Sequence, residues 1–258
     1  MITAASNSRI KRLVQLNQKP KLRRTEDVFL AEGVKMFLEA PREQLQEVYV
    51  SESFLEKCSC REHLEEVGYE VVSDSVFSKI SDTCTPQGVL CVLKQFHYNI
   101  EEMLRDKAPL FLLLENIQDP GNLGTMLRTG EGAGVSGIIM SRDTVDLYNP
   151  KVIRSTMGSI YRVPFYYADD FAAAVHQVQR AGVSVYAAHL RGINSYACQD
   201  YTKGTAFLIG NEGNGLREET AELADCYIRI PMEGKVESLN AAVASSILMY
   251  EAHRQRAI

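Results

Sequence analysis

The sequence predicts an α/β protein made of two units, in which the C-terminal unit is a mostly parallel sheet with helices on both faces. Apolar runs alternate with helical patterns along the second half of the chain, which is typical of a parallel sheet. The run LFLLL at 110–114 is apolar throughout, as expected for a strand buried on both faces. A polar stretch at 96–108 is the predicted linker to a smaller α/β pattern that precedes it.

The N-terminal unit, residues 1–95, is predicted to be a small α/β domain. A short basic helix is expected at 6–18, with an apolar face that includes Ile10, Leu13 and Leu16. Strands are expected at 28–33, 48–50, 69–72 and 88–93, with helices through 36–38 and around 52–66.

The C-terminal unit, residues 109–258, carries the stronger alternation. Its strands are expected at 110–114, 137–140, 183–188, 206–209 and 227–230, and its helices include 170–181 and 238–254. This spacing favours helices between parallel strands rather than hairpins.

Composition restricts the class of protein. The chain has 258 residues, of which 45% are hydrophobic and 24% charged, as in ordinary globular proteins. No apolar run is long enough to cross a bilayer and no apolar signal core follows the N-terminus, so we expect a cytoplasmic protein without a membrane partner. The six cysteines are scattered and lack zinc-site spacing, so we expect reduced thiols and no metal.

The charge is unevenly distributed. The net charge is −5, yet residues 1–24 contain seven lysines and arginines and no acid. Such an arm can bind phosphates even in an acidic protein, or it can be a solvated helix face. Charge alone leaves both alternatives open.

The string GAGVSG at 132–137 matches the pattern of a dinucleotide-binding loop. Such a loop follows a strand and opens a helix, whereas this one follows a predicted helix and leads into a strand. We therefore expect these glycines to end the helix and turn the chain.

A first motif, DPGNLGTMLRTG at 119–130, joins a strand to a helix through a turn. Asn122 is the expected N-cap, and Arg128 shares a helical face with Thr125. A guanidinium at this end of the sheet is suited to binding phosphate. A capped helix with a surface arginine and no function would show the same sequence pattern.

A second motif, IGNEGNGL at 209–216, follows a buried strand. Its glycines permit positive φ angles and close approach of the backbone, which favours a ligand loop over an irregular one. Glu212 is the one charge at its apex and is expected to orient Arg128 or to contact substrate.

A third motif, IPMEGKVESLNAAVA at 230–244, leads from a strand into the last helix. Ser238 is the expected N-cap, with Asn240 in the first turn. In the segment 149–159, Arg154 is expected to bind phosphate or to form a structural ion pair.

The order and wording of the three motifs resemble those of the SpoU (TrmH) family of RNA ribose 2′-O-methyltransferases. The resemblance implies a catalytic domain that contains a deep trefoil knot and an N-terminal domain like a small ribosomal RNA-binding protein. It also implies a homodimer that binds S-adenosylmethionine and RNA and needs no metal.

The resemblance also implies roles for residues. The catalytic set is Arg128, Asn122, Glu212, Ser238 and Asn240. The cofactor set is Leu190, Gly210, Ile230, Met232 and Leu239. The RNA-binding set, taken from the basic arm and the 149–159 segment, is Arg9, Lys11, Arg12, Lys21, Arg23, Arg24 and Arg154. Whether Arg128 acts as a base or anchors a phosphate is left open.

The expected activity is methyl transfer from S-adenosylmethionine to a ribose 2′-hydroxyl of RNA, and the two-domain layout favours 23S or other ribosomal RNA. The alternatives are the same reaction on tRNA and a non-catalytic RNA-binding protein with an inactive methyltransferase domain. A nucleotide-dependent oxidoreductase is disfavoured by the misplaced glycine string.

Overall fold

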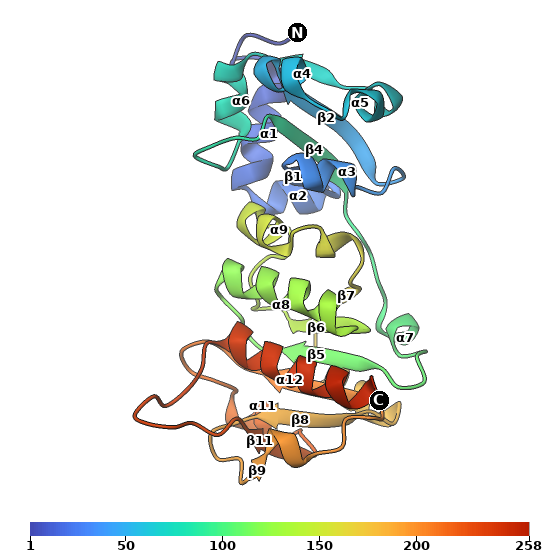
Figure 1. The fold of residues 1–258 in the computed structure, drawn as a ribbon, viewed down its shortest axis with the longest axis vertical. Helices are drawn as coiled ribbons and strands as arrows, with labels where there is room; N and C mark the ends of the chain where they lie inside the picture. Colours follow the sequence, from blue (N-terminus) through green and yellow to red (C-terminus); the bar gives the residue numbers. More distant parts are fainter. Residues whose placement is uncertain (258) are drawn as a thin grey trace. The chain divides into compact units, whose positions relative to one another are not determined.

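The computed structural model describes residues 1–257 and divides into two compact units (Figure 1). The first unit comprises residues 1–96 and 146–161, and the second comprises 97–145 and the chain from 162 onward. Residues 146–161 lie within the predicted C-terminal domain 109–258, and by their contacts they group with the first unit. No pattern in the sequence indicates that this segment packs on a unit whose first part ends 50 residues earlier in the chain.

The first unit is built on a mixed sheet. Its strands are β1 (Val28–Glu32), β2 (Leu45–Ser51), β3 (Glu70–Val72) and β4 (Val89–Lys94), in the spatial order β1-β4-β2-β3. Strand β4 is antiparallel to both of its neighbours, and β2 and β3 are parallel. The helices of its N-terminal part are α1 (Ser8–Gln18), α2 (Pro20–Glu26), α3 (Val34–Leu38), α4 (Glu52–Lys57), α5 (Arg61–Val67) and α6 (Asp74–Ile80).

Helix α1 covers this sheet with one apolar face. Ile10, Leu13 and Leu16 recur every three residues, so they lie on one side of the helix, and all three are buried against α6 and the sheet. The helix expected around 52–66 is instead two helices, because the chain leaves helical geometry between Lys57 and Arg61.

The segment 146–161 is held in the first unit by side-chain contacts. It contains α9 (Pro150–Thr156) and a short 3₁₀ turn at Ser159–Tyr161. The Tyr148 ring lies 4.8 Å from that of Phe29, and the Tyr161 hydroxyl donates to the carbonyl of Met36 at 3.0 Å.

Arg23 is the buried charge of this unit, with only 1% of its surface exposed. Its guanidinium donates to the carbonyls of Leu16 and Asn17 at 2.6 and 3.1 Å, and it pairs with Asp146 at 2.6 Å. Removing a partner from such a pair leaves polar groups without bonding partners. The burial of Arg23 therefore favours a structural role over the predicted contact with RNA.

The second unit is built on a parallel sheet. Its strands are β5 (Leu110–Leu114), β6 (Gly137–Ser141), β7 (Phe165–Ala168), β8 (Ser184–Ala188), β9 (Asn194–Ser195), β10 (Thr205–Ile209) and β11 (Cys226–Arg229). In the described chain their order is β7-β6-β5-β10-β8-β11-β9, and every neighbouring pair is parallel.

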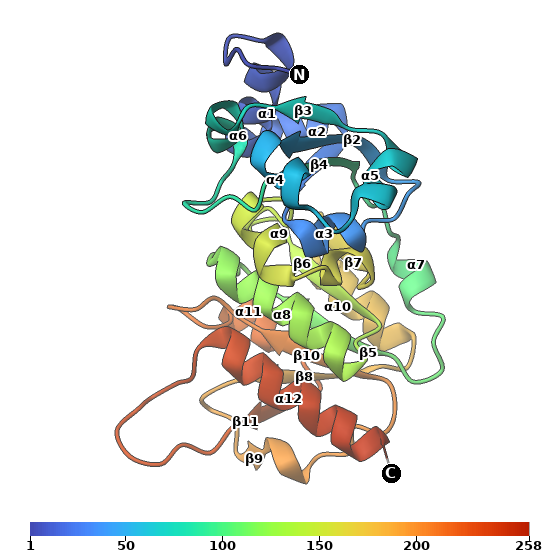
Figure 2. The same cartoon turned by 45° about the horizontal axis from the view of Figure 1, so that its top comes forward.

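Helices cover both faces of this sheet. Successive side chains of a strand point to opposite faces, so Phe111 and Leu113 lie on the same face. Phe111 and Leu113 share a buried cluster with Val175 and Val178 of α10 (Phe171–Arg180), together with α7 (Ile100–Met103) and α11 (Glu218–Ala221). Helices α8 (Pro120–Ala133) and α12 (Ala241–Arg256) lie against each other, as Figures 1 and 2 show. The α/β fold class is confirmed, and the trefoil knot stays a prediction.

The glycine string at 132–137 turns the chain, as its position in the sequence predicts. Gly134 ends α8 in the left-handed conformation with φ of 78°, and Gly137 begins β6. No helix follows it directly, so this string offers no N-terminus to a pyrophosphate.

The buried position of Arg23 yields a prediction for stability. Arg23→Ala should lower the free energy of unfolding by about 3 kcal/mol, because two carbonyls and Asp146 lose their partner and a cavity remains. The neighbouring Arg24 is exposed, so Arg24→Ala should change stability by less than about 0.5 kcal/mol. Urea denaturation of both variants measures this, and equal stabilities would contradict the role given to Arg23.

Candidate active site

The site lies where four neighbouring parallel strands end. Leu114 of β5 is level with Ile209 of β10, and Ala188 of β8 is level with Ile228 of β11. Because parallel strands have their carboxyl ends at one edge, the segments that follow them gather there. These segments are the three motifs and the loop after β8.

The first motif turns into α8 with Asp119 as its cap. The Asp119 carboxylate accepts a hydrogen bond from the backbone N–H of Asn122 at 2.8 Å, and Pro120 occupies the first helical position. The expectation that Asn122 caps this helix is therefore wrong. The Asn122 side chain is left free to bond with the other two motifs.

Glu212 of the second motif bonds directly to this turn. One oxygen of its carboxylate accepts from the Asn122 side chain and from the backbone N–H of Asp119, each at 3.0 Å. The other oxygen accepts from the backbone N–H of Gln118 at 3.1 Å. A single carboxylate thus holds the first and second motifs together.

These bonds set the ionisation of Glu212. Partial burial raises its pKa, but the bonds from Asn122 and from the Asp119 and Gln118 amides outweigh burial and hold the pKa below its usual range. A carboxyl whose pKa is lowered by folding stabilises the folded state. This stabilisation is complete at pH values above the pKa of the unfolded state, which is about 4.3. The contribution is lost only as the pH falls through the folded pKa, so the cluster is intact at neutral pH.

Asn240 connects the third motif to the same cluster. Its side-chain N–H donates to the Asn122 oxygen at 3.0 Å, and its own oxygen accepts from the amides of Ala242 and Val243 at 2.9 and 3.2 Å. Asn240 is thus the N-cap of α12, and the prediction of Ser238 as the cap is wrong. The helix begins later than expected because the residue that bonds to Asn122 also caps it.

The second motif is shaped by a close approach of its backbone. A Cβ atom at Gly210 would lie 2.2 Å from the backbone of both Gly215 and Leu216, so a residue with a side chain does not fit there. The Asn211 side chain donates to the carbonyl of Asn116 at 2.8 Å and accepts from the amide of Gly213 at 2.9 Å. The loop is therefore fixed at both arms.

A buried carboxylate fixes the far end of this loop. Glu115, which follows β5, is 1% exposed and accepts from the Arg217 amide at 2.8 Å and from the Thr220 hydroxyl. The Arg217 guanidinium lies 3.5 Å from Glu115 and also pairs with Asp143. The strand end and the loop exit are thus joined by a paired, hydrogen-bonded charge.

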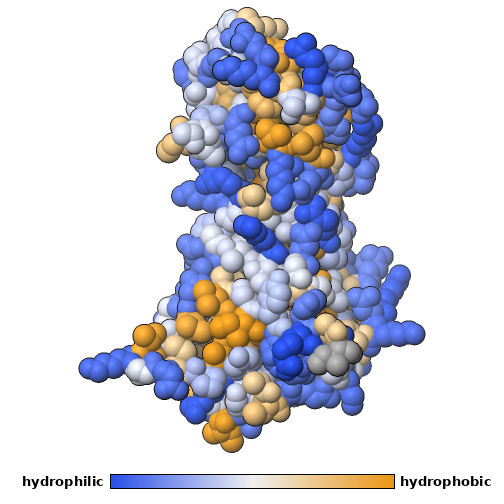
Figure 3. Space-filling view, viewed as in Figure 1, coloured by the Kyte–Doolittle hydropathy of each residue, from blue (hydrophilic) through white to orange (hydrophobic). Residues whose placement is uncertain are grey.

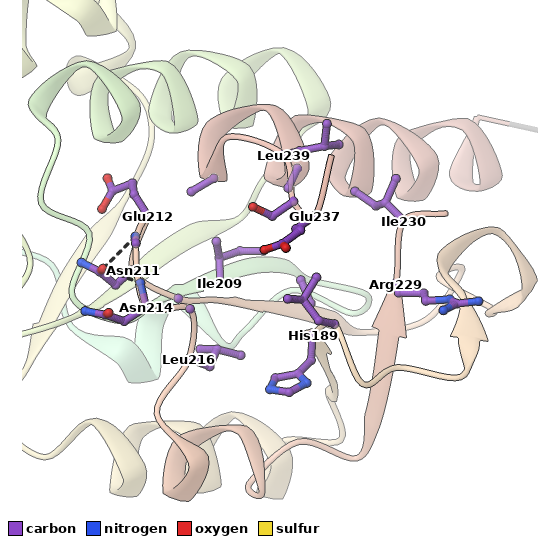
Figure 4. A pocket seen from close by; sticks show the side chains of 18 of the residues that line it. His189, Ile209, Asn211, Glu212, Asn214, Leu216, Arg229, Ile230, Glu237 and Leu239 are labelled. Atoms are coloured by element: carbon purple, nitrogen blue, oxygen red, sulfur yellow. Dashed lines mark hydrogen bonds between the residues drawn. The ribbon is translucent and has the colours of Figure 1, made fainter. Parts of the chain in front are cut away.

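A cavity of about 270 Å³ opens at this edge of the sheet (Figure 4). Its walls are the segments after β8, β10 and β11 and the start of α12. Of the predicted residues it contains Leu190, Gly210, Glu212, Ile230, Met232, Ser238 and Leu239. All five predicted cofactor residues therefore line one cavity.

A more open hollow adjoins this cavity through shared residues. Asn211, Glu212 and Gly213 line both, and Asn122 and Asn240 line the hollow. The three motifs therefore line two adjoining hollows, one more enclosed and one more open.

Arg128 is not part of either lining. It lies on an exposed face of α8, and it has no hydrogen bond or ion pair with another residue that the structure describes. Arg128 thus belongs to the helix that starts at the site, and its guanidinium has no bonding partner among the described residues.

The predicted RNA-binding residues divide into paired and unpaired groups. Arg9 pairs with Glu70 at 2.8 Å, Arg12 with Glu26 and Glu47 at 2.7 Å each, and Arg154 with Asp82 at 3.2 Å. Arg23 is buried. Lys11, Lys21 and Arg24 are exposed and have no ion pair with other residues of the described range 1–257.

Sequence reasoning missed three ionisable residues of the cavity, His189, Arg229 and Glu237, of which Arg229 is the last residue of β11. His189 immediately follows β8, and Glu237 immediately precedes Ser238, so position relative to the strand and the motif was the available signal. Burial and the charge of Arg191 lower the pKa of His189, against the opposing effect of Glu218. Its Nδ1 accepts from the Arg191 amide at 3.1 Å, which fits a neutral imidazole.

Among residues 1–257, no group of three or more histidine, cysteine or acidic side chains could hold a metal ion. Residues 1–257 also contain no helix long and apolar enough to cross a membrane.

Comparison with known proteins gives matches to both halves of the chain. Residues 109–250 match the SpoU rRNA Methylase family, and residues 7–91 match the MRM3-like substrate binding domain. The 23S rRNA (guanosine(2553)-2'-O)-methyltransferase RlmP of Bacillus subtilis is 32% identical over 252 residues, which cover 96% of this chain and 97% of that protein.

Two further matches also extend over most of the chain. The 23S rRNA (guanosine-2'-O-)-methyltransferase RlmB of Bordetella pertussis is 32% identical over 222 residues, covering 83% of this chain and 91% of that protein. The crystal structure of an AdoMet bound rRNA methyltransferase from Sinorhizobium meliloti is 32% identical with a TM-score of 0.85, covering 98% of this chain and 97% of that one.

The Glu212 cluster yields a prediction for local order. Glu212→Ala should speed hydrogen exchange at the amides of Gln118 and Asp119 by about tenfold or more, because both donate to this carboxylate. Glu219 is exposed and receives no hydrogen bond from a residue in 1–257, so Glu219→Ala is the matched control. Exchange measured by NMR should stay unchanged in that control, and protection retained in Glu212→Ala would contradict the cluster.

Proposed function

We infer the function from the family to which this chain belongs, the SpoU rRNA Methylase family. We propose that the protein transfers a methyl group from S-adenosylmethionine to a ribose 2′-hydroxyl of ribosomal RNA. The observation that carries the proposal is the bonding of Glu212, Asn122 and Asn240, one from each motif, beside the cavity.

S-adenosylmethionine is the cofactor that this family uses, and we place it in the more enclosed cavity. Ile209, Leu216 and Leu239 give the cavity apolar walls suited to an adenosyl group. We propose that the backbone at Gly210, Ile230, Met232 and Leu239, with Leu190, holds the cofactor. When bound, it supplies an electrophilic methyl group on a sulfonium.

The residues of the hollow then position the ribose. An in-line displacement gains most of its rate from orientation, and the bonded Glu212, Asn122 and Asn240 form a pre-arranged set. We propose that Ser238, which lines the cavity, acts with them. We assign Arg128 to the phosphate beside the reacting ribose, because a guanidinium offers paired donors to phosphate oxygens.

Ribosomal RNA is favoured over tRNA by the extent of the similarity. RlmP, whose name gives 23S rRNA as its substrate, matches both units of this chain. The N-terminal unit matches a substrate binding domain, and it exposes the unpaired Lys11, Lys21 and Arg24. We propose that this unit binds RNA through these side chains in the cytoplasm, where ribosomal RNA is found.

We further propose that the protein is a homodimer, as the family resemblance implies. Helix α12 exposes Val243 and Tyr250, each to about half of its surface (48% and 49%). Figure 3 shows apolar surface over the region where Figure 1 places the start of this helix. Large apolar side chains on a helix that also begins at the site suit burial against a second copy.

Methyl transfer to ribosomal RNA tests the proposed function. The purified chain with labelled S-adenosylmethionine and ribosomal RNA should give a ribose 2′-O-methyl nucleotide, and RNA from a strain that lacks the protein is the most informative substrate. Arg128→Ala should slow single-turnover transfer about 1,000-fold while leaving cofactor affinity within about twofold, because Arg128 does not line the cavity.

Arg180→Ala is the control, since Arg180 is an exposed arginine on α10, on the other face of the sheet. Its activity should match that of the unaltered chain. Cofactor binding without any methyl transfer to RNA would support the non-catalytic alternative, and full activity of Arg128→Ala would refute the role of that arginine.

A second prediction concerns the basic arm. Replacing Lys21 and Arg24 together by alanine should weaken RNA binding and reduce the slope of log affinity against log salt by about 1.5, because two phosphate contacts are lost. Lys57 and Lys79, exposed lysines of α4 and α6, make the matched double control. Filter binding over a range of salt concentrations measures both, and equal slopes would show that the arm does not contact RNA.

A further inference from the structure

The more enclosed cavity contains a charge that takes no part in the hydrogen bonds between the motifs. Its lining has four ionisable side chains, those of His189, Glu212, Arg229 and Glu237. The Glu212 carboxylate points away from the cavity in Figure 4, toward the groups that donate to it. The Arg229 guanidinium also points away (Figure 4).

His189 adds no positive charge that could compensate an acid here. Its Nδ1 accepts a hydrogen bond from the Arg191 amide, which requires an unprotonated nitrogen. Its ring lies 5.1 Å from that of Tyr227, which further shields it from water. The imidazole is therefore a neutral part of the cavity wall.

Glu237 is the remaining charge, and it is uncommitted. It has no hydrogen bond or ion pair with another residue of the described chain, and its carboxylate points toward the middle of the cavity in Figure 4. Ile209 and Leu239 are among the apolar residues beside it. Low-polarity walls strengthen the field of such a charge on anything that enters.

We propose that Glu237 recognises the positive charge of the methyl donor and thereby makes the cavity prefer donor over product. The inference rests on the proposed function. S-adenosylmethionine carries one net positive charge at neutral pH, and S-adenosylhomocysteine carries none, because methyl transfer returns the bonding electron pair to sulfur. A carboxylate distinguishes the two by this charge, and release of the product becomes easier.

The size of the effect follows from the exposure of Glu237. Glu237 is exposed and also lines the cavity, so its attraction for a cation is weaker than in a dry interior and stronger than in bulk water. We expect a preference of about tenfold from this residue, which corresponds to about 1.4 kcal/mol.

Calorimetry with both ligands tests the proposal. In Glu237→Gln, which keeps the size of the side chain, the Kd for S-adenosylmethionine should rise about tenfold and that for S-adenosylhomocysteine less than twofold. Glu233 is an exposed acid of the same loop that does not line the cavity, so Glu233→Gln is the matched control and should leave both values unchanged. A thermal unfolding midpoint equal to that of the unaltered chain shows that each variant is folded.

The outcomes separate the two proposals. If binding of both ligands is weakened equally, Glu237 contacts a group that they share. If binding of neither is weakened, Glu237 contacts neither ligand. Each of these results overturns the inference and leaves the proposed function standing. If the unaltered chain binds neither ligand, the proposed function fails and the inference fails with it.

Discussion

The carboxylate of Glu212 is the constraint on which the site depends. It accepts from two consecutive backbone amides and one side-chain amide of the first motif, and Asn122 passes the bonding on to Asn240. Without it, the turn of the first motif would lose its side-chain link to the loop of the second. The cluster works because parallel strands bring their carboxyl ends to one edge, so three segments far apart in sequence become neighbours.

Much of the fold could be predicted from sequence, because buried parallel strands leave a strong signal. The apolar runs at 110–114 and 206–209 are strands, and the cofactor residues that the family resemblance implies line one cavity. The caps were wrong for a physical reason. Asp119 and Asn122, or Ser238 and Asn240, are equally good caps locally, and the choice between them is made by bonds to the other motifs.

Other features depend on partners that no local pattern reveals. Arg23 and Arg24 are adjacent and identical in type, yet one is buried against Asp146 and two carbonyls and the other is exposed. Glu237 was missed because an acid in a polar loop resembles any solvated residue until the opposite walls of the cavity are known. In each case the sequence supplied the charge, and the long-range packing decided its use.

Residues 146–161 restrict where this chain can be cut into fragments that keep their own contacts. The backbone passes from one unit to the other three times, at 96, at 145 and at 161. A fragment beginning at residue 97 would carry Tyr148 and Tyr161 away from Phe29 and Met36, and a fragment ending at 96 would lose them. A single cut at residue 96 would therefore leave the Phe29 ring and the Met36 carbonyl without these partners, so an intact first unit needs both of its chain segments.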